Sequence, residues 1–170
     1  MFNAVAERFR VPLRWWRARP VLTQDAGLAA TFTVLGLLPP LAANGLRLGD
    51  LPLHRDGPLA VFLALAQCLP LVIRRRWPAL CLALVACAFA AYQLLGYPRS
   101  FSSVGVLLAL YAAGAYEASF RRELIAGATA SYVVLAVALA GLGATERPVD
   151  YAVFYLALCA CWGAGVFVRS

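Results

Sequence analysis

The sequence predicts an all-α membrane protein, a polytopic bundle of six transmembrane helices with both chain ends on the cytoplasmic side. Of the 170 residues, 63% are hydrophobic and only 14% are charged, with a mean hydropathy of +0.77, which is more apolar than a soluble domain of this size can bury. Apolar stretches recur along the whole chain and leave no polar block long enough for a soluble domain. One membrane domain is therefore expected over residues 21–170.

Residues 1–20 are predicted to form a basic amphipathic segment in the cytoplasmic headgroup layer. Its apolar side chains recur at helical spacing and fall within an arc of about 80° at 100° per residue. They are Phe2, Val5, Phe9, Leu13 and Trp16. The basic side chains expected to contact lipid headgroups here are Arg8, Arg10, Arg14, Arg17 and Arg19. A disordered arginine-rich tail that only fixes topology is an open alternative, because Pro12 interrupts any continuous helix. A cleaved signal peptide fits less well, because Leu41-Ala42-Ala43 is a poor cleavage site.

Six apolar runs follow, each of about 16 to 20 residues, close to the length that a hydrocarbon core requires. They cover residues 26–43, 58–73, 78–97, 101–116, 124–144 and 149–168. Proline opens the third run, and at a helix start its missing N–H group costs nothing. The second and fourth runs are short, and they could instead form a re-entrant pair that leaves both chain ends on the same side.

Arginine distribution sets the predicted orientation, because cytoplasmic loops are enriched in Lys and Arg. With the N-terminus inside, eleven of the fifteen basic residues, all of them arginine, lie on the inner side. Besides the N-terminal five, these are Arg74, Arg75, Arg76, Arg121, Arg122 and Arg169. The four on the outer side are Arg47, Arg55, Arg99 and Arg147. The net charge of +7 is thus attributed to topology and to headgroup contact. No nucleic-acid partner is expected, because no basic stripe interleaved with exposed aromatics follows the N-terminal segment.

Small residues recur four apart on three of the runs, which predicts close helix contacts in a membrane. The three stripes are Ala79, Ala83, Cys87 and Ala91; Gly105, Ala109 and Ala113; and Ala157, Cys161 and Gly165.

Few side chains in the predicted spans carry polar chemistry. The acidic residues Asp25, Glu117, Glu123 and Asp150 fall at span ends, where water or headgroups are expected to solvate them. No charged residue lies deep in a span, where an ion-coupled carrier would keep one. Gln67 and Gln93 are each expected to donate an interhelical hydrogen bond. Tyr92 and Tyr111 are expected to lie deeper than the interfacial aromatic belt and to line an intramembrane cavity.

No catalytic, metal-binding or cofactor-binding residue is expected in this chain. The five cysteines lie in apolar runs without a CxxC pair and are read as small hydrophobes. The single histidine, His54, falls in a predicted outer loop, either simply solvated or as an acid sensor. Phosphate-binding and hydrolase motifs are absent from the sequence.

Two segments carry a family resemblance. Leu69-Pro70-Leu71-Val72-Ile73-Arg74-Arg75-Arg76-Trp77-Pro78, followed by an alanine- and leucine-rich stretch, resembles the N-terminal membrane region of actinobacterial sensor histidine kinases. Leu110-Tyr111-Ala112-Ala113-Gly114-Ala115-Tyr116 is similar to the fourth span of that family. The resemblance implies a multi-pass input module in the plasma membrane, a homodimer, and a response regulator as the partner of a kinase module. That module, with its phosphate-accepting histidine and its ATP site, is missing from this chain. His54 cannot replace the histidine, because the predicted topology places it outside.

Three functional hypotheses follow. In the first, the chain is the membrane input region of a two-component histidine kinase, and a shift of the sixth span is transmitted through Arg169. In the second, it is a small permease or transporter subunit, which predicts pseudo-symmetric halves with helices broken near the midplane. A purely structural membrane partner is the third.

Overall fold

The computed structural model describes residues 21–38, 45–49, 51–53, 57–117 and 120–169. The described residues form six α-helices, two 3-10 segments and an isolated bridge between Leu46 and Ser100, and they include no strand. The all-α prediction is therefore confirmed for the part of the chain that the structure describes. The predicted N-terminal segment 1–20, with its five arginines, and His54 lie outside the described residues.

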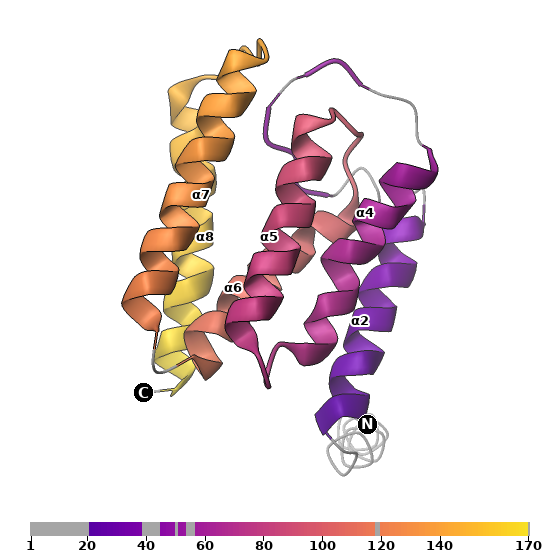
Figure 1. The fold of residues 1–170 in the computed structure, drawn as a ribbon, viewed down its shortest axis with the longest axis vertical. Helices are drawn as coiled ribbons and strands as arrows, with labels where there is room; N and C mark the ends of the chain where they lie inside the picture. The colour runs from indigo at the N-terminus through magenta and orange to yellow at the C-terminus, as the bar shows by residue number, and fades with distance from the viewer. Residues whose placement is uncertain (1–20, 39–44, 50, 54–56, 118–119, 170) are drawn as a thin grey trace, which may run out of the picture.

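The helices follow the predicted apolar runs closely (Figure 1). In chain order they are α2 (Val21–Leu37), α4 (Pro58–Cys68), η1 (Leu69–Ile73), α5 (Pro78–Leu94), η2 (Phe101–Val104), α6 (Gly105–Tyr116), α7 (Arg121–Gly141) and α8 (Pro148–Arg169). Proline occupies the first position of α4, α5 and α8, where the N–H group it lacks has no intrahelical partner.

Several predicted ends need correction. The first helix covers Val21–Leu37 and not 26–43, and Pro39 follows, which disfavours helical backbone in the residue before it. The third helix stops at Leu94, before Gly96 at φ +65°, and α7 stops at Gly141, before Gly143 at φ +93°. Left-handed glycines of this kind commonly end helices.

Helices α2, α4 and α5 lie together on one side of the molecule, α7 and α8 lie on the other, and α6 joins the two groups (Figure 1). The start of α2, the η1–α5 turn, the α6–α7 junction and the end of α8 share one end of the bundle. This end, called the arginine end below, carries Arg74, Arg75, Arg76, Arg121, Arg122 and Arg169. The described arginines of the opposite end are Arg47, Arg99 and Arg147. The structure therefore gathers the arginines of the predicted inner loops in one place.

Two glycines allow α6 and α8 to approach at backbone distance. A Cβ atom on Gly114 would lie 2.5 Å from the carbonyl oxygen of Trp162. A Cβ atom on Gly165 would lie 2.2 Å from that of Tyr111. The predicted contact role of Gly165 is confirmed, and its partner Gly114 lies beside the predicted stripe of α6.

The loop before α4 folds over the end opposite to the arginine end. Leu48 and Leu51 are buried there, and Gln93 holds the loop by accepting the N–H of Leu48 (3.2 Å) and donating to the carbonyl of Leu46 (3.4 Å). The carboxylate of Glu146 accepts the N–H of Gly49 at 2.9 Å. These contacts hold the described part of the loop against the opposite end of the bundle.

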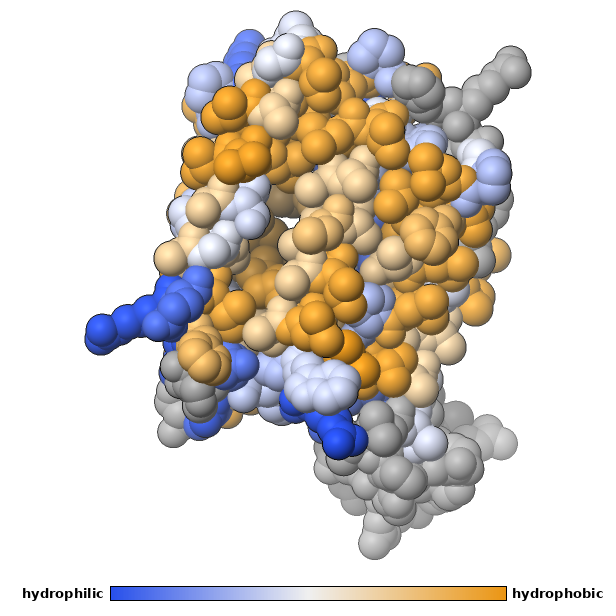
Figure 2. Space-filling view, in the orientation of Figure 1, coloured by the Kyte–Doolittle hydropathy of each residue, from blue (hydrophilic) through white to orange (hydrophobic). Residues whose placement is uncertain are grey.

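Two of the described helices, α7 and α8, are long and apolar enough to cross a membrane, at 21 and 22 residues. Only 11% and 6% of their apolar windows are buried inside the protein, which leaves an apolar surface larger than water tolerates. Figure 2 shows hydrophobic residues over most of the viewed face. This supports an association with a membrane. The other α-helices have 17 residues or fewer, so six complete spans stay a prediction.

Candidate functional site: an apolar cavity walled by four helices

A cavity of about 470 Å³ lies between α5, α6, α7 and α8. Its volume falls in the range of roughly 300–1,000 Å³ that small-molecule sites occupy. Figure 2 shows the surface hollowed on the viewed face, between α7 and α5 as Figure 1 places them. The cavity is therefore reached from the apolar flank of the protein.

Small side chains on two facing helices leave this space open. The small residues that α5 contributes to the wall are Ala79, Ala83, Ala86, Cys87 and Ala90. Helix α7 contributes Gly127 and Ala128, and a Cβ atom built on Gly127 would meet no atom within 4 Å. The prediction that Ala79, Ala83 and Cys87 form a helix contact is wrong, because these three residues face the cavity. Small residues allow close packing only when another helix fills the groove they make.

Hydroxyl groups from α7 and α8 meet at the cavity wall. The Thr129 and Tyr155 hydroxyls are 2.9 Å apart, and the Tyr132 hydroxyl donates to the Tyr151 carbonyl at 2.7 Å. The Tyr132 ring packs on that of Tyr155, with centroids 5.4 Å apart, and on that of Phe154 at 6.2 Å. The hydroxyls of Thr129, Tyr132 and Tyr155 are thus each engaged in a hydrogen bond within the protein. Apart from these hydroxyls, Ser131 and Glu123, the side chains of the wall are apolar.

The cavity extends toward the arginine end. Ala79 and Glu123, in the first turns of α5 and α7, both line it. Trp77 and Arg76 precede α5, and the guanidinium of Arg76 lies 5.5 Å from the Trp77 ring centre. Arg76 and Arg122 are exposed, and the structure shows no ion pair to either of them within the described ranges. Charge is therefore concentrated at one end of an otherwise apolar space.

The side chain of Arg121 is bound to the protein. It donates to the carbonyls of Glu117 (2.9 Å) and Gly114 (3.3 Å), at the end of α6. Carbonyls at a helix C-terminus lack intrahelical donors and favour a cation there. The guanidinium of Arg121 therefore caps the end of α6, and its headgroup contact stays a prediction.

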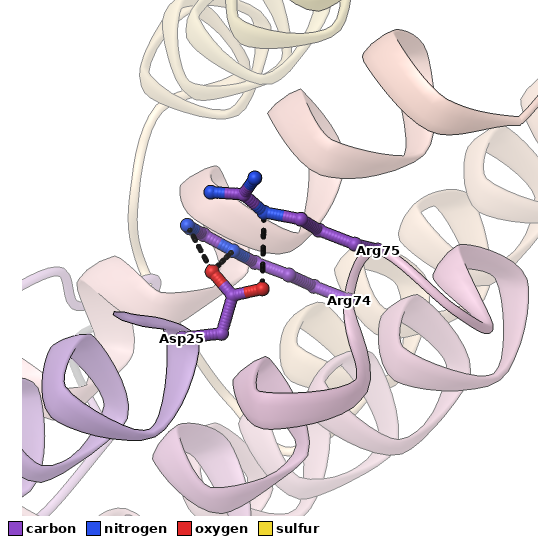
Figure 3. Close-up of polar contacts among 3 residues, drawn as sticks. All are labelled: Asp25, Arg74 and Arg75. Carbon is purple, nitrogen blue, oxygen red and sulfur yellow. Dashed lines mark hydrogen bonds and ion pairs between the residues drawn. The ribbon is translucent and has the colours of Figure 1, made fainter. Parts of the chain in front are cut away.

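A buried carboxylate lies between two consecutive arginines at the same end (Figure 3). Asp25 of α2 is 1% exposed, and its Oδ1 accepts from Arg74 Nη2 at 2.8 Å and from Arg74 Nε at 3.1 Å. The other oxygen, Oδ2, lies 3.0 Å from Arg75 Nε. The expectation that Asp25 is solvated is wrong, because packing of α2 on η1 removes it from water and supplies cations in place of water.

The two arginines tie three elements together. Arg74, with 11% of its side chain exposed, is enclosed, while Arg75 also covers the Tyr116 ring at 5.6 Å, which brings the end of α6 into the cluster. Both arginines thus contact Asp25 within the protein, and their headgroup contact stays a prediction; Arg76 is exposed.

The polar side chains predicted to face other helices behave differently. Gln93 contacts the loop before α4, as described above. Gln67 donates to the Leu63 carbonyl of its own helix at 3.3 Å, and its buried Oε1 has no partner among the described residues. Neither glutamine makes the expected interhelical hydrogen bond in the part of the chain described.

The predicted tyrosines do not line this cavity. Tyr92 is buried against Tyr97, with ring centres 5.3 Å apart, and the Tyr111 carbonyl faces α8 at Gly165. Tyr132 and Tyr155 line it instead. Their position inside the apolar runs could have identified them, because an interfacial aromatic belt does not reach that depth. A second signal is Thr129, which lies about one helical turn before Tyr132.

The described residues of the site offer mainly apolar binding surface. All five cysteines are free thiols, and no group of three or more metal-ligating side chains occurs among the residues that were placed. Glu123 is the charged residue in the cavity wall. An apolar space with paired hydroxyls and charge at one end fits an amphipathic or apolar ligand.

Comparison with known proteins gives one relationship. No curated protein matches the chain, and no solved structure matches it. A family model described as a domain of unknown function (DUF7134) matches residues 12–170. That match spans the whole helical bundle, including both walls of the cavity and the Asp25 cluster, so the chain belongs to the DUF7134 family.

Proposed function

We propose that this chain is the membrane-embedded input region of a two-component sensor histidine kinase, passing a membrane-borne signal to a cytoplasmic kinase module. The observation that supports this most is the position of α8. Tyr155, Leu158, Cys159 and Trp162 of α8 line the cavity, and the same helix runs on to Arg169 at the arginine end. A ligand in the cavity therefore touches the helix that would continue into the kinase.

The proposal includes six membrane crossings in the plasma membrane, with both ends in the cytoplasm. The gathering of six arginines at one end supports this orientation. The shorter helices are compatible with it, because α4 packs on both α2 and α5, and these helices need not meet lipid along their whole length. Helix α2, at 17 residues, is about 25 Å long at 1.5 Å per residue.

The proposed mechanism is a change in the spacing of α7 and α8. Helix α8 is fixed to α6 at backbone distance, whereas hydroxyl and ring contacts beside the cavity connect it to α7. A ligand that binds the two spacings unequally shifts their populations. In a homodimer, that shift alters the pair of helices that enter the kinase modules, where ATP is bound and from which a response regulator receives phosphate.

The alternative of a permease gains no support from the helix breaks. The 3-10 segment η1 forms the last five residues of the apolar run 58–73, and η2 forms the first four residues of the run 101–116. A transporter of the broken-helix type would place its breaks near the middle of the membrane.

The first test is the coding sequence beyond Ser170. We expect a helix with a phosphate-accepting histidine, followed by an ATP-binding domain. A stop codon directly after Ser170 would refute the proposal.

The second test uses that longer protein and inserts residues after Arg169. One residue rotates the following helix by about 100°, whereas seven return it to within about 20° of its starting phase. We expect a single insertion to change autophosphorylation severalfold and a seven-residue insertion to restore it. Equal activity of all insertions would show that α8 does not transmit a rotation or tilt.

A further inference from the structure

We infer that the cavity binds one acyl chain of an anionic phospholipid, whose headgroup lies between Arg76 and Arg122 at the arginine end. The inference rests on the proposed membrane placement and names the ligand of the cavity. Neither the family match nor the proposed signalling role specifies a ligand.

The walls select hydrocarbon along most of the cavity. Leu82, Phe89, Leu110, Leu135 and Trp162 supply its larger apolar surfaces. The hydroxyls of Thr129, Tyr132 and Tyr155 are already hydrogen-bonded across α7 and α8. A polar ligand would find few partners there, since Ser131 and Glu123 are the other polar side chains of the wall, whereas an acyl chain needs none.

The charges select the headgroup and its direction. Of the described arginines near the η1–α5 turn and the α6–α7 junction, Arg74 and Arg75 contact Asp25, and Arg121 caps α6. Arg76 and Arg122 are exposed, at the starts of the two helices between which the cavity opens. The six described arginines of this end outnumber its three described carboxylates, Asp25, Glu117 and Glu123, so an anionic headgroup is attracted to this end.

The size of the cavity argues against a second copy of the chain as occupant. An α-helix is about 10 Å wide and rises 5.4 Å per turn, so one turn occupies roughly 400 Å³. The cavity, at about 470 Å³, would accept little more than a single turn. A flexible chain entering from the apolar flank in Figure 2 fits both the volume and the opening.

The test measures lipid retention by the full chain. Protein delipidated in detergent is offered phosphatidylglycerol and phosphatidylcholine in equal amounts, and bound lipid is counted by native mass spectrometry. We expect one tightly held phosphatidylglycerol per chain. Absence of a retained lipid overturns the proposal, and equal retention of the two lipids overturns its charge selectivity.

Matched variants locate the lipid. Gly127→Leu fills the cavity from α7, where a Cβ atom meets open space, and should weaken phosphatidylglycerol binding at least about tenfold. Gly163→Leu makes the same change on α8. Gly163 does not line the cavity, and a Cβ atom built on it would meet no atom within 4 Å, so this variant should bind phosphatidylglycerol as the unmodified protein does. Ala83→Leu, also in the wall, provides a second filled variant if Gly127→Leu does not fold. Normal binding by the folded filled variants places the lipid elsewhere and refutes the assignment.

Charge variants test the headgroup. Arg76→Gln and Arg122→Gln should each weaken phosphatidylglycerol binding roughly fivefold without affecting phosphatidylcholine. Arg147→Gln, at the opposite end, should have no effect. Unchanged binding in both arginine-end variants would contradict the headgroup position. Because none of these measurements involves a kinase, lipid binding can hold when the signalling proposal fails, and the insertion series can succeed when lipid binding fails.

Discussion

Asp25 holds a carboxylate with 1% exposure between the guanidiniums of Arg74 and Arg75. A buried ion pair adds little when it is compared with well-packed apolar residues, but removing one partner leaves the other buried and uncompensated. The importance of Asp25 therefore lies in the charge it neutralises.

Asp25→Asn keeps the shape of the side chain and removes its charge. We expect the free energy of unfolding to fall by about 3 kcal/mol, because the enclosed Arg74 loses its counterion. Thermal or denaturant unfolding in lipid nanodiscs measures the loss.

Two controls separate the pair from general damage. Arg75→Gln should cost about 1 kcal/mol or less, because a third of the Arg75 side chain is exposed. The double variant Asp25→Asn/Arg74→Gln should be more stable than the sum of the single changes predicts. Strict additivity would show that Asp25 and Arg74 do not interact.

The residue scale is also where the sequence is least informative. Asp25 and Arg74 are 49 positions apart, and their pairing depends on how α2 docks on η1. The arginine run itself identifies the loop end of a span, but not which of its three side chains is turned inward. For Gln67 the sequence predicts too much. A polar residue within a span predicts a hydrogen-bond partner on another helix, but Gln67 donates to the Leu63 carbonyl of its own helix.

At the scale of elements, the α6–α8 contact depends on two glycines. Gly165→Ala would place a methyl group 2.2 Å from the Tyr111 carbonyl oxygen, so the helices must separate. We expect a loss of about 1–3 kcal/mol, as for other overpacked sites, together with a lower unfolding temperature.

Gly163→Ala is the matched control on the same helix. Its Cβ atom meets nothing within 4 Å, and alanine favours helix over glycine, so stability should be unchanged or slightly higher. If both alanine variants unfolded at the same temperature, the close approach of α6 and α8 would carry no stabilisation.

Element bounds were largely predictable, because local chemistry sets them. Pro58 and Pro78 mark helix starts, and the runs 58–73 and 101–116 coincide with α4–η1 and η2–α6. The contacts that each helix face makes were not predictable. The stripe containing Gly165 meets a helix and the stripe containing Ala83 borders a cavity, although both are spaced four apart, because spacing does not reveal what lies opposite.

For the whole molecule, the orientation in the bilayer is the prediction with the widest consequences. Cysteine introduced as Thr145→Cys should react with a membrane-impermeant maleimide in intact cells, whereas Arg122→Cys should react only after permeabilisation. The native thiols Cys68 and Cys81 are buried and the other three lie in apolar helices, so a wild-type sample sets the background. Labelling of both positions in intact cells would contradict the proposed topology.

Pairing of Asp25 with the η1–α5 turn also implies an order of events during biogenesis. In the proposed topology, Arg74 and Arg75 emerge before α2 has docked on them, as free cations that can retain their loop on the cytoplasmic face while insertion proceeds. Docking of α2 then places the single carboxylate of Asp25 between them, and Arg76 is left as the most exposed cation of that turn. The same guanidiniums would thus act first as a topology signal and later as an internal counterion, which separates the charge that the insertion machinery reads from the charge that the mature surface displays.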